Sequence, residues 1–233
     1  MVQTTPDPVT TKWAASLTQQ LLARHGVLTR EAVTAETIPG GFGVVYPVLK
    51  AMEDNGRIRR GYFVAGLGAT QFAVPGALDL LRSLRDAPDD VEVVVLAATD
   101  PANPYGATLH WPASAAGEAA KAGRGPTRSV GATVILVNGA IAAYLARGDR
   151  QLVTFLPEAE PDRSKAGRAV AQVLIDRART GEPGRDAPRG MLIEEIDGTP
   201  PPLHAMSAFL IDAGFVAGAM GFQATFRHSG GGR

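Results

Sequence analysis

The chain has 233 residues, of which 45% are hydrophobic and 20% are charged, a composition typical of globular proteins. Lysine plus arginine and aspartate plus glutamate each number 23, so any affinity for nucleic acid must come from a local basic surface and not from net charge. The absence of cysteine excludes disulfides, thiol nucleophiles and zinc sites built on thiolates.

The first third of the sequence predicts three short helices followed by two strands. Apolar side chains recur at helical spacing in each helix, and Gly26 and Pro39-Gly40-Gly41 separate the helices. Pro47 within the third helix predicts either a late start or a kink. Three helices and a hairpin are the arrangement of a winged helix, whose third helix enters the major groove of DNA. We therefore predict a winged-helix domain over residues 10–86, with helices at 10–24, 30–35, 42–55 and 77–85 and strands at 57–64 and 71–74.

The second half of the sequence is richer in strands. A continuous apolar run from Val91 to Ala98 predicts a buried strand, Asn138-Gly139 predicts a tight hairpin, and the Gly-rich residues 113–127 predict a surface loop. Closure of the strands into a small barrel would remove exposed edges. We therefore predict an α+β fold, in which the winged helix is followed by a β-barrel-like domain over residues 90–230 with one or two packed helices. Its elements are expected at 91–98, 130–137, 140–146, 151–156, 191–196 and 215–226 (strands) and at 163–179 and 203–213 (helices).

Four stretches of the sequence resemble the C-terminal region of the large helicase-related (Lhr) proteins. They are Gly40-Gly41-Phe42 with residues 45–53, residues 56–64, residues 66–73 and residues 98–106. The resemblance implies a bacterial DNA-repair setting and a winged helix followed by a β-barrel, similar to a group of winged-helix DNA glycosylases that unhook crosslinked bases. Lhr proteins are ATP-dependent superfamily 2 helicases, but this sequence lacks a Gly-x-x-x-x-Gly-Lys-Ser/Thr phosphate loop. We therefore expect ATP and magnesium to bind in a motor core outside this sequence, and no cofactor to bind here.

Basic and aromatic residues around the predicted hairpin are the candidates for DNA contact. Alternation along the strand places Arg57 and Arg59 on one face and Arg60 on the other. Two guanidinium groups on one face can straddle phosphates and release counterions, and an exposed ring beside them, with Tyr62 the best placed, can stack on an unpaired base. The alternative is solvated surface charge paired with acidic neighbours. The predicted DNA-binding residues are Tyr46, Lys50, Arg57, Arg59, Arg60 and Tyr62.

Two polar residues are candidates for glycosylase chemistry. Asp100 follows an apolar strand and could act as a general base that activates water against the sugar of a flipped nucleotide; its alternative role is to start a turn. Gln71 is suggested by the glutamine-bearing motifs of the related glycosylases; its alternative is a strand residue whose amide is hydrogen-bonded. The four histidines show no ligand spacing, so no metal site is expected.

These features leave three functions open. The first is a DNA-binding and assembly module of an ATP-dependent DNA repair helicase, with DNA, the helicase core of the same parent chain and a second protomer as partners. The second is a DNA glycosylase, for example one that excises uracil, and the third is a protein-interaction domain without DNA contact. Residues 1–11 lack the apolar core of a signal peptide, and no apolar run reaches the ~20 residues that cross a bilayer. We therefore expect a cytoplasmic protein without a membrane partner.

Overall fold

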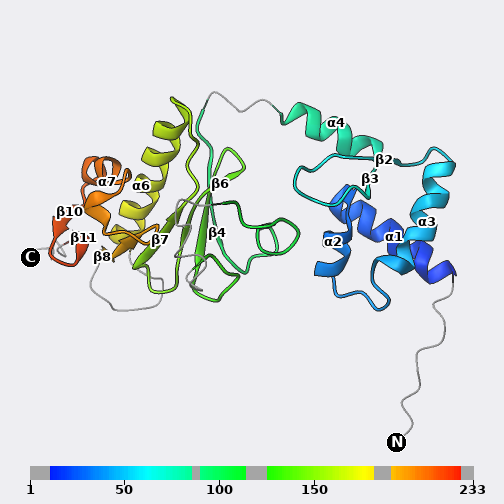
Figure 1. Cartoon of the computed structure of the whole chain (residues 1–233), viewed down its shortest axis with the longest axis horizontal. Coiled ribbons are helices and arrows are strands. Elements are labelled where there is room, and N and C mark those ends of the chain that lie inside the picture. The colour runs from blue at the N-terminus through cyan, green and yellow to red at the C-terminus, as the bar shows by residue number, and fades with distance from the viewer. Residues whose placement is uncertain (1–10, 86–89, 114–124, 181–189, 227–233) are drawn as a thin grey trace, which may run out of the picture. The chain divides into compact units, whose positions relative to one another are not determined.

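The computed structural model of the chain describes residues 11–85, 90–113, 125–180 and 190–226. The described residues form two compact units (Figure 1), one from the residues before 88 together with 104–110 and the other from the remainder. The predicted boundaries, 10–86 and 90–230, differ from this division because they place residues 104–110 in the second domain. Within the described ranges, the structure has no helix long and apolar enough to span a membrane.

The first unit has the topology of a winged helix, as predicted. Its sheet is antiparallel with the order β1-β3-β2, so β3 is the central strand. The two-residue strand β1 was not predicted, because two residues are too few to show a strand period. The elements of this unit are α1 (Thr11–His25), β1 (Val27–Leu28), α2 (Arg30–Ala35), α3 (Phe42–Asp54), β2 (Arg59–Gly61), β3 (Gln71–Ala73) and α4 (Pro75–Ser83).

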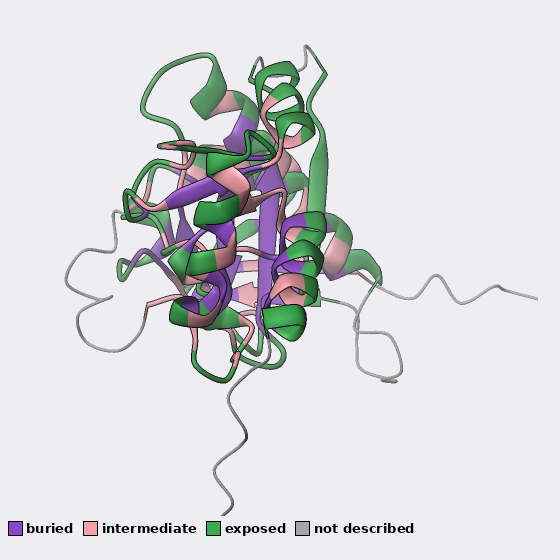
Figure 2. Cartoon of the chain, turned by 90° about the vertical axis from the view of Figure 1, so that its right-hand side faces the viewer, coloured by how far each residue is buried: buried purple, intermediate pink, exposed green. Residues whose placement is uncertain are grey.

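Helices α1, α2 and α3 of the first unit share a core with strand β3, whereas α4 buries no side chain. Leu22 of α1, Val33 of α2, Leu49 of α3 and Phe72 of β3 are all buried in one core. In Figure 2 buried and exposed segments alternate along the helices. This core holds α3 and the hairpin of β2 and β3 in a fixed arrangement, which is what a DNA-binding surface on these elements needs.

The described residues of the second unit form two sheets and two α-helices. The larger sheet has the order β4-β5-β6-β7-β9, and the smaller one is antiparallel with the order β10-β11-β8. The strands are β4 (Val93–Ala97), β5 (Thr133–Val137), β6 (Ala140–Leu145), β7 (Gln151–Thr154), β8 (Gly190–Ile193), β9 (Glu195–Ile196), β10 (Val216–Gly218) and β11 (Gly221–Thr225). The helices are α6 (Asp162–Thr180), the 3₁₀ helix η2 (Pro201–Leu203) and α7 (Ser207–Ala213).

Helix α6 is the centre of the second core. It contacts α7 and strands of both sheets, and Val170 and Leu174 on its inner face are fully buried. Gly167 lets the ring of Phe209 on α7 come very close, since a Cβ atom at Gly167 would lie 2.6 Å from the ring carbons Cδ2 and Cε2. The predicted α+β class and the packed helices are therefore confirmed.

The predicted buried strand at 91–98 is instead an exposed sheet edge. Among the described strands β4 pairs with β5 alone, and Val93, Val94 and Val95 retain exposed fractions of 36%, 37% and 45%. The prediction was wrong because apolar composition does not reveal whether a strand has one neighbour or two. β4 and β9 end the order of the described strands, so closure into a barrel stays a prediction. Most of the predicted loop at 113–127 lies outside the described residues.

Candidate nucleic-acid interface

Helix α3 buries its apolar side chains and leaves a narrow exposed face. Phe42, Val45 and Leu49 point into the core. The helix begins at Phe42 and continues through Pro47, so the predicted late start is not observed. Pro47 is tolerated because it is exposed and because the carbonyl it leaves without a helical N–H, that of Gly43, also lies on the exposed face. This face consists of Gly43, Pro47, Lys50, Ala51 and Asp54.

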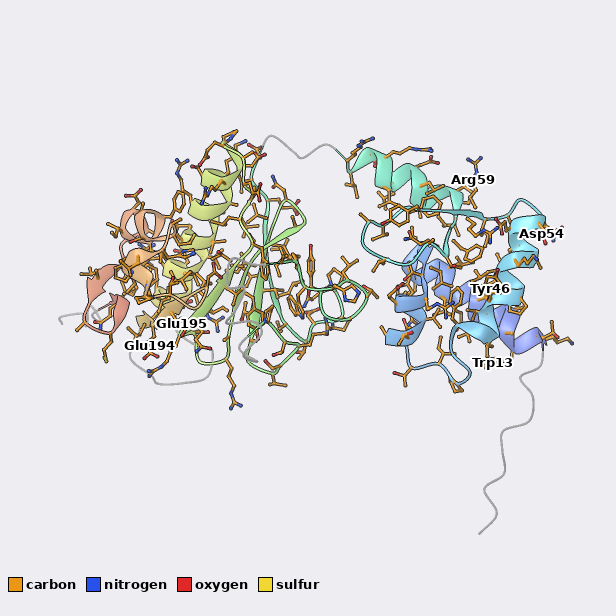
Figure 3. All side chains as sticks on the ribbon, viewed as in Figure 1. Trp13, Tyr46, Asp54, Arg59, Glu194 and Glu195 are labelled. Carbon is orange, nitrogen blue, oxygen red and sulfur yellow. The ribbon has the colours of Figure 1, made fainter. Side chains whose placement is uncertain are left out.

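Tyr46 lies at the border of the core and not on the exposed face. Its ring centroid is 5.8 Å from that of Phe42 and 6.2 Å from that of Phe72, the second pair in an edge-to-face arrangement. Figure 3 labels Tyr46 on α3, within the first unit. Aromatic contacts of this kind stabilise packing. The structure therefore favours a role for Tyr46 in holding α3 on the sheet over direct DNA contact.

The arginines of the hairpin fall on two sides of the sheet. The strand register places Arg60 opposite Phe72, on the side that faces the helices, where Nε of Arg60 lies 3.2 Å from Oε1 of Glu53. Arg59 lies opposite Ala73 and is exposed, and Figure 3 shows it extending outward from β2. Arg57 is exposed as well. Arg60 is thus exposed as well, but its charge is balanced by Glu53, and Arg57 and Arg59 are the other exposed charges of this segment.

Gln71 organises the wing, which we define as residues 62–70 between β2 and β3. Its side chain is fully buried. Oε1 accepts hydrogen bonds from the N–H groups of Phe63 and Val64, both at 2.8 Å. Nε2 donates to the carbonyls of Val64 at 2.9 Å and Gly68 at 3.0 Å. A primary amide has two acceptor lone pairs and two N–H donors. All four are used inside the wing, so none remains to position a water molecule, and the geometry favours the structural alternative for Gln71.

Three further side chains anchor the wing. Leu67 is buried at its tip. The N–H of Gly66 donates to the phenol oxygen of Tyr62 at 3.0 Å, and the N–H of Gly68 donates to Oε1 of Glu31 at 3.4 Å. The wing is therefore held at its start, its tip and its end, and it is pre-organised for contact with a ligand.

No pattern in the sequence singles out Glu31 as an anchor of the wing. Burial raises the pKa of its carboxyl group. Hydrogen bonds from its own backbone N–H, from Thr29 and from Gly68, together with the charge of His110, outweigh burial and leave the pKa below its ordinary value. The carboxylate therefore stays ionised at neutral pH and keeps accepting the hydrogen bond from the wing. Only the fold brings this α2 residue to residue 68, so no sequence pattern signals the contact.

Asp100 lies in the second unit, in a tightly bonded loop. Its Oδ1 accepts from the N–H of Ala102 at 2.8 Å, which is the turn-forming role that its position after a strand also predicts. The guanidinium of Arg128 donates to the backbone carbonyls of Thr99, Asp100 and Asn103. Asp100 and Gln71 belong to different units. Among the described residues, no group of three histidine, aspartate or glutamate side chains is arranged to hold a metal ion.

Comparison with known proteins identifies the family of the first unit. Residues 7–93 match the family model described as large helicase-related protein, winged-helix domain. These residues are a winged-helix domain of the large helicase-related family. The resemblance seen in the four sequence stretches is therefore confirmed.

Two bacterial relatives extend the similarity over most of the chain. The chain is 42% identical over 219 residues to the "Lhr helicase/ probable uracil glycosylase" of Mycolicibacterium smegmatis. It is 34% identical over 212 residues to the "Lhr helicase/uracil glycosylase" of Escherichia coli. These alignments cover 91% and 89% of this chain but only 14% and 13% of the two relatives.

Proposed function

We propose that the chain binds DNA through strand β2, the residues just before it and the exposed face of α3. The observation that carries the proposal is the winged-helix topology with Arg57 and Arg59 exposed on the hairpin and Lys50 exposed on the third helix. In helix-turn-helix folds the third helix approaches the major groove while neighbouring elements contact the backbone. Four exposed cations, Lys50, Arg57, Arg59 and Arg60, lie between α3 and the end of β2, and the exposed anion of this segment is Asp54. Arg60 is paired with Glu53, so the surface is locally basic although the chain has no net charge.

The exposed face of α3 is better suited to contacts with the phosphate backbone of DNA than to recognition of base edges. Specific recognition of base edges relies on arginine, lysine, asparagine and glutamine side chains. The face of α3 offers Lys50 and Asp54, and its other members are Gly43, Pro47 and Ala51. We therefore expect binding that depends on phosphate contacts, with weak sequence preference and strong sensitivity to salt.

Single substitutions of the arginines test this proposal. Arg57→Ala and Arg59→Ala should each weaken binding of the full chain to duplex DNA severalfold in fluorescence anisotropy at low salt. Arg60→Ala should weaken it less, because the charge of Arg60 is balanced by Glu53. Arg82→Ala is the matched control, since Arg82 is an exposed arginine on α4, outside the wing and α3. Equal effects of all four substitutions would contradict the proposed surface.

Excision of uracil from DNA is the second candidate function. It is supported by the names of the two relatives, each of which includes a uracil glycosylase, and by alignments that span about nine-tenths of this chain. We propose Asp100 as its general base, acting on a base flipped out of the duplex. The test is release of uracil from an oligonucleotide by the purified chain without ATP. Loss of product in Asp100→Asn, with the folded state intact by circular dichroism, supports this role, and unchanged activity refutes it.

A helicase core is the partner that the relatives suggest. Both relatives are named as helicases, and this sequence has no phosphate-binding loop of its own. We propose that the chain works beside a motor that binds ATP and magnesium. Assembly with a second protomer, and a place in DNA repair, remain predictions that sedimentation and repair assays can test.

A further inference from the structure

We infer that Tyr62 is a stacking platform for an unpaired base, which directs the wing to junctions between single-stranded and duplex DNA. This inference rests on the proposed binding of DNA by β2 and α3, next to the wing. It names the class of DNA that the wing selects, which the basic residues alone do not specify, because phosphates are present in every form of DNA.

The exposure of the Tyr62 ring is the first observation. Its exposed fraction is 63%, although tyrosine is a residue that folding normally buries in large part. The neighbouring Phe63 is partly buried and packs closely over Gly61, where a Cβ atom would lie 2.6 Å from the ring carbon Cζ. One ring of this pair is thus used for packing inside the wing, and the other presents its surface to solvent.

The fixed orientation of the ring is the second observation. The phenol oxygen of Tyr62 accepts a hydrogen bond from the N–H of Gly66 at 3.0 Å. Residues 63, 64 and 68 are in turn bonded to the buried amide of Gln71. An exposed ring that is tethered at its far end loses little conformational entropy when a base stacks on it. This is the property that a stacking site needs, and a freely rotating surface tyrosine lacks it.

The chemistry of the surface selects an unpaired base as the occupant. In an intact duplex both faces of every internal base are covered by its neighbours, so a ring can stack only on an unpaired or terminal base. Arg59, three residues before Tyr62, is exposed on the same hairpin and provides a contact for a phosphate. A cation for the backbone combined with an aromatic ring for the base is the combination that binds single strands.

The hydrogen bond of Tyr62 to Gly66 also fits a purely structural role, so the variants are chosen to separate the two. Tyr62→Phe keeps the ring and removes the tether, whereas Tyr62→Leu removes both the ring and the tether. Leu84→Ala is the control, because Leu84 on the first unit is 69% exposed but lies outside the wing. Thermal unfolding of each variant shows whether the first unit stays folded.

The experiment compares binding of the full chain to two DNA probes, an intact duplex and the same duplex with a single-stranded tail. The tail carries 2-aminopurine at its first unpaired position, whose fluorescence falls when it stacks. We expect Tyr62→Leu to weaken binding of the tailed probe roughly tenfold or more, and to leave binding of the blunt duplex unchanged. Tyr62→Phe loses only the tether, so it should bind the tailed probe less tightly than wild type but more tightly than Tyr62→Leu, and it should still quench the probe. Leu84→Ala should behave as wild type.

Each outcome has one meaning. Failure of wild-type protein to bind either probe at low salt overturns the proposed DNA binding itself. Binding of both probes with equal affinity, without quenching and without an effect of Tyr62→Leu, overturns the stacking platform and leaves DNA binding standing. Equal loss of affinity in Tyr62→Phe and Tyr62→Leu shows that the tether matters and the ring does not, which also overturns the inference.

Discussion

Replacing Gln71 with leucine, which has a similar volume, should destabilise the winged-helix unit. The substitution removes four hydrogen bonds from a fully buried side chain. At ~0.5–1.5 kcal/mol for each bond the loss is about 2–6 kcal/mol. We expect the lower part of this range, about 2–4 kcal/mol, because the bonded backbone groups are only partly buried and water can reach some of them. Such a loss is a large share of the ~5–15 kcal/mol that stabilises a typical domain.

Gln71→Glu is a useful second variant, because it keeps the shape of the side chain but replaces the NH₂ group, which donates two hydrogen bonds, with an oxygen that only accepts them. An ionised carboxylate would face the carbonyl oxygens of Val64 and Gly68, with which the amide now bonds. The folded state therefore favours the protonated form, which raises the pKa of the introduced carboxyl group. The stability of this variant should be higher below the ordinary carboxyl pKa and should fall as the pH rises through the raised pKa.

Tryptophan fluorescence can follow the two units separately. The chain has two tryptophans, Trp13 in the first unit and Trp111 in the second. In a Trp111→Phe background, urea unfolding followed by fluorescence reports the first unit alone. Hydrogen exchange should also accelerate at the N–H groups of Phe63 and Val64 in the leucine variant. A free energy of unfolding within about 0.5 kcal/mol of the parent protein would refute the role assigned to this amide.

Three further changes test other parts of the structure. Gly167→Ala should destabilise the second unit in urea unfolding, because the new methyl group would collide with the Phe209 ring. Alanine by itself favours a helix over glycine by ~1 kcal/mol. In a Phe209→Ala background, which removes the ring, Gly167→Ala should therefore stabilise the unit. Asp54→Asn should strengthen DNA binding a few-fold at low salt and less at high salt, as measured by anisotropy. The hydrogen bond from Arg24 lowers the pKa of Glu36. The ionised carboxylate therefore stabilises the fold above the ordinary carboxyl pKa, and this stability should be lost as the pH falls through the lowered value. In acid unfolding, Arg24→Ala should lose less stability over this pH range than the parent protein.

The sequence predicted the elements whose signals are local. Helical spacing located the three helices of the winged helix, and Asn138-Gly139 marked the hairpin between β5 and β6, where both residues have the positive φ that a tight hairpin turn requires. The alternation of Arg59 and Arg60 was also predicted, and the register with β3 gives its physical cause.

The features that sequence analysis missed depend on contacts between distant residues. The apolar sequence of β4 does not reveal that, among the described strands, it pairs with β5 alone. The contacts of Glu31 with residue 68, and of Arg128 with the loop at 99–103, join segments that only the fold brings together. Gln71 was identified as important, but whether its amide faced the wing or a ligand could be decided only from the four bonds it makes.

The salt dependence of DNA binding is the sharpest test of phosphate contact by Arg57 and Arg59. The measurement is the affinity of the full chain for a blunt duplex across a salt series, for wild type and for the double variant Arg57→Ala/Arg59→Ala. The account predicts that affinity falls steeply with salt, and that the double variant binds more weakly with a log–log slope shallower by about 0.9 for each phosphate that is no longer neutralised. Wild-type affinity and slope in the double variant, or no binding of wild type at low salt, would contradict the account.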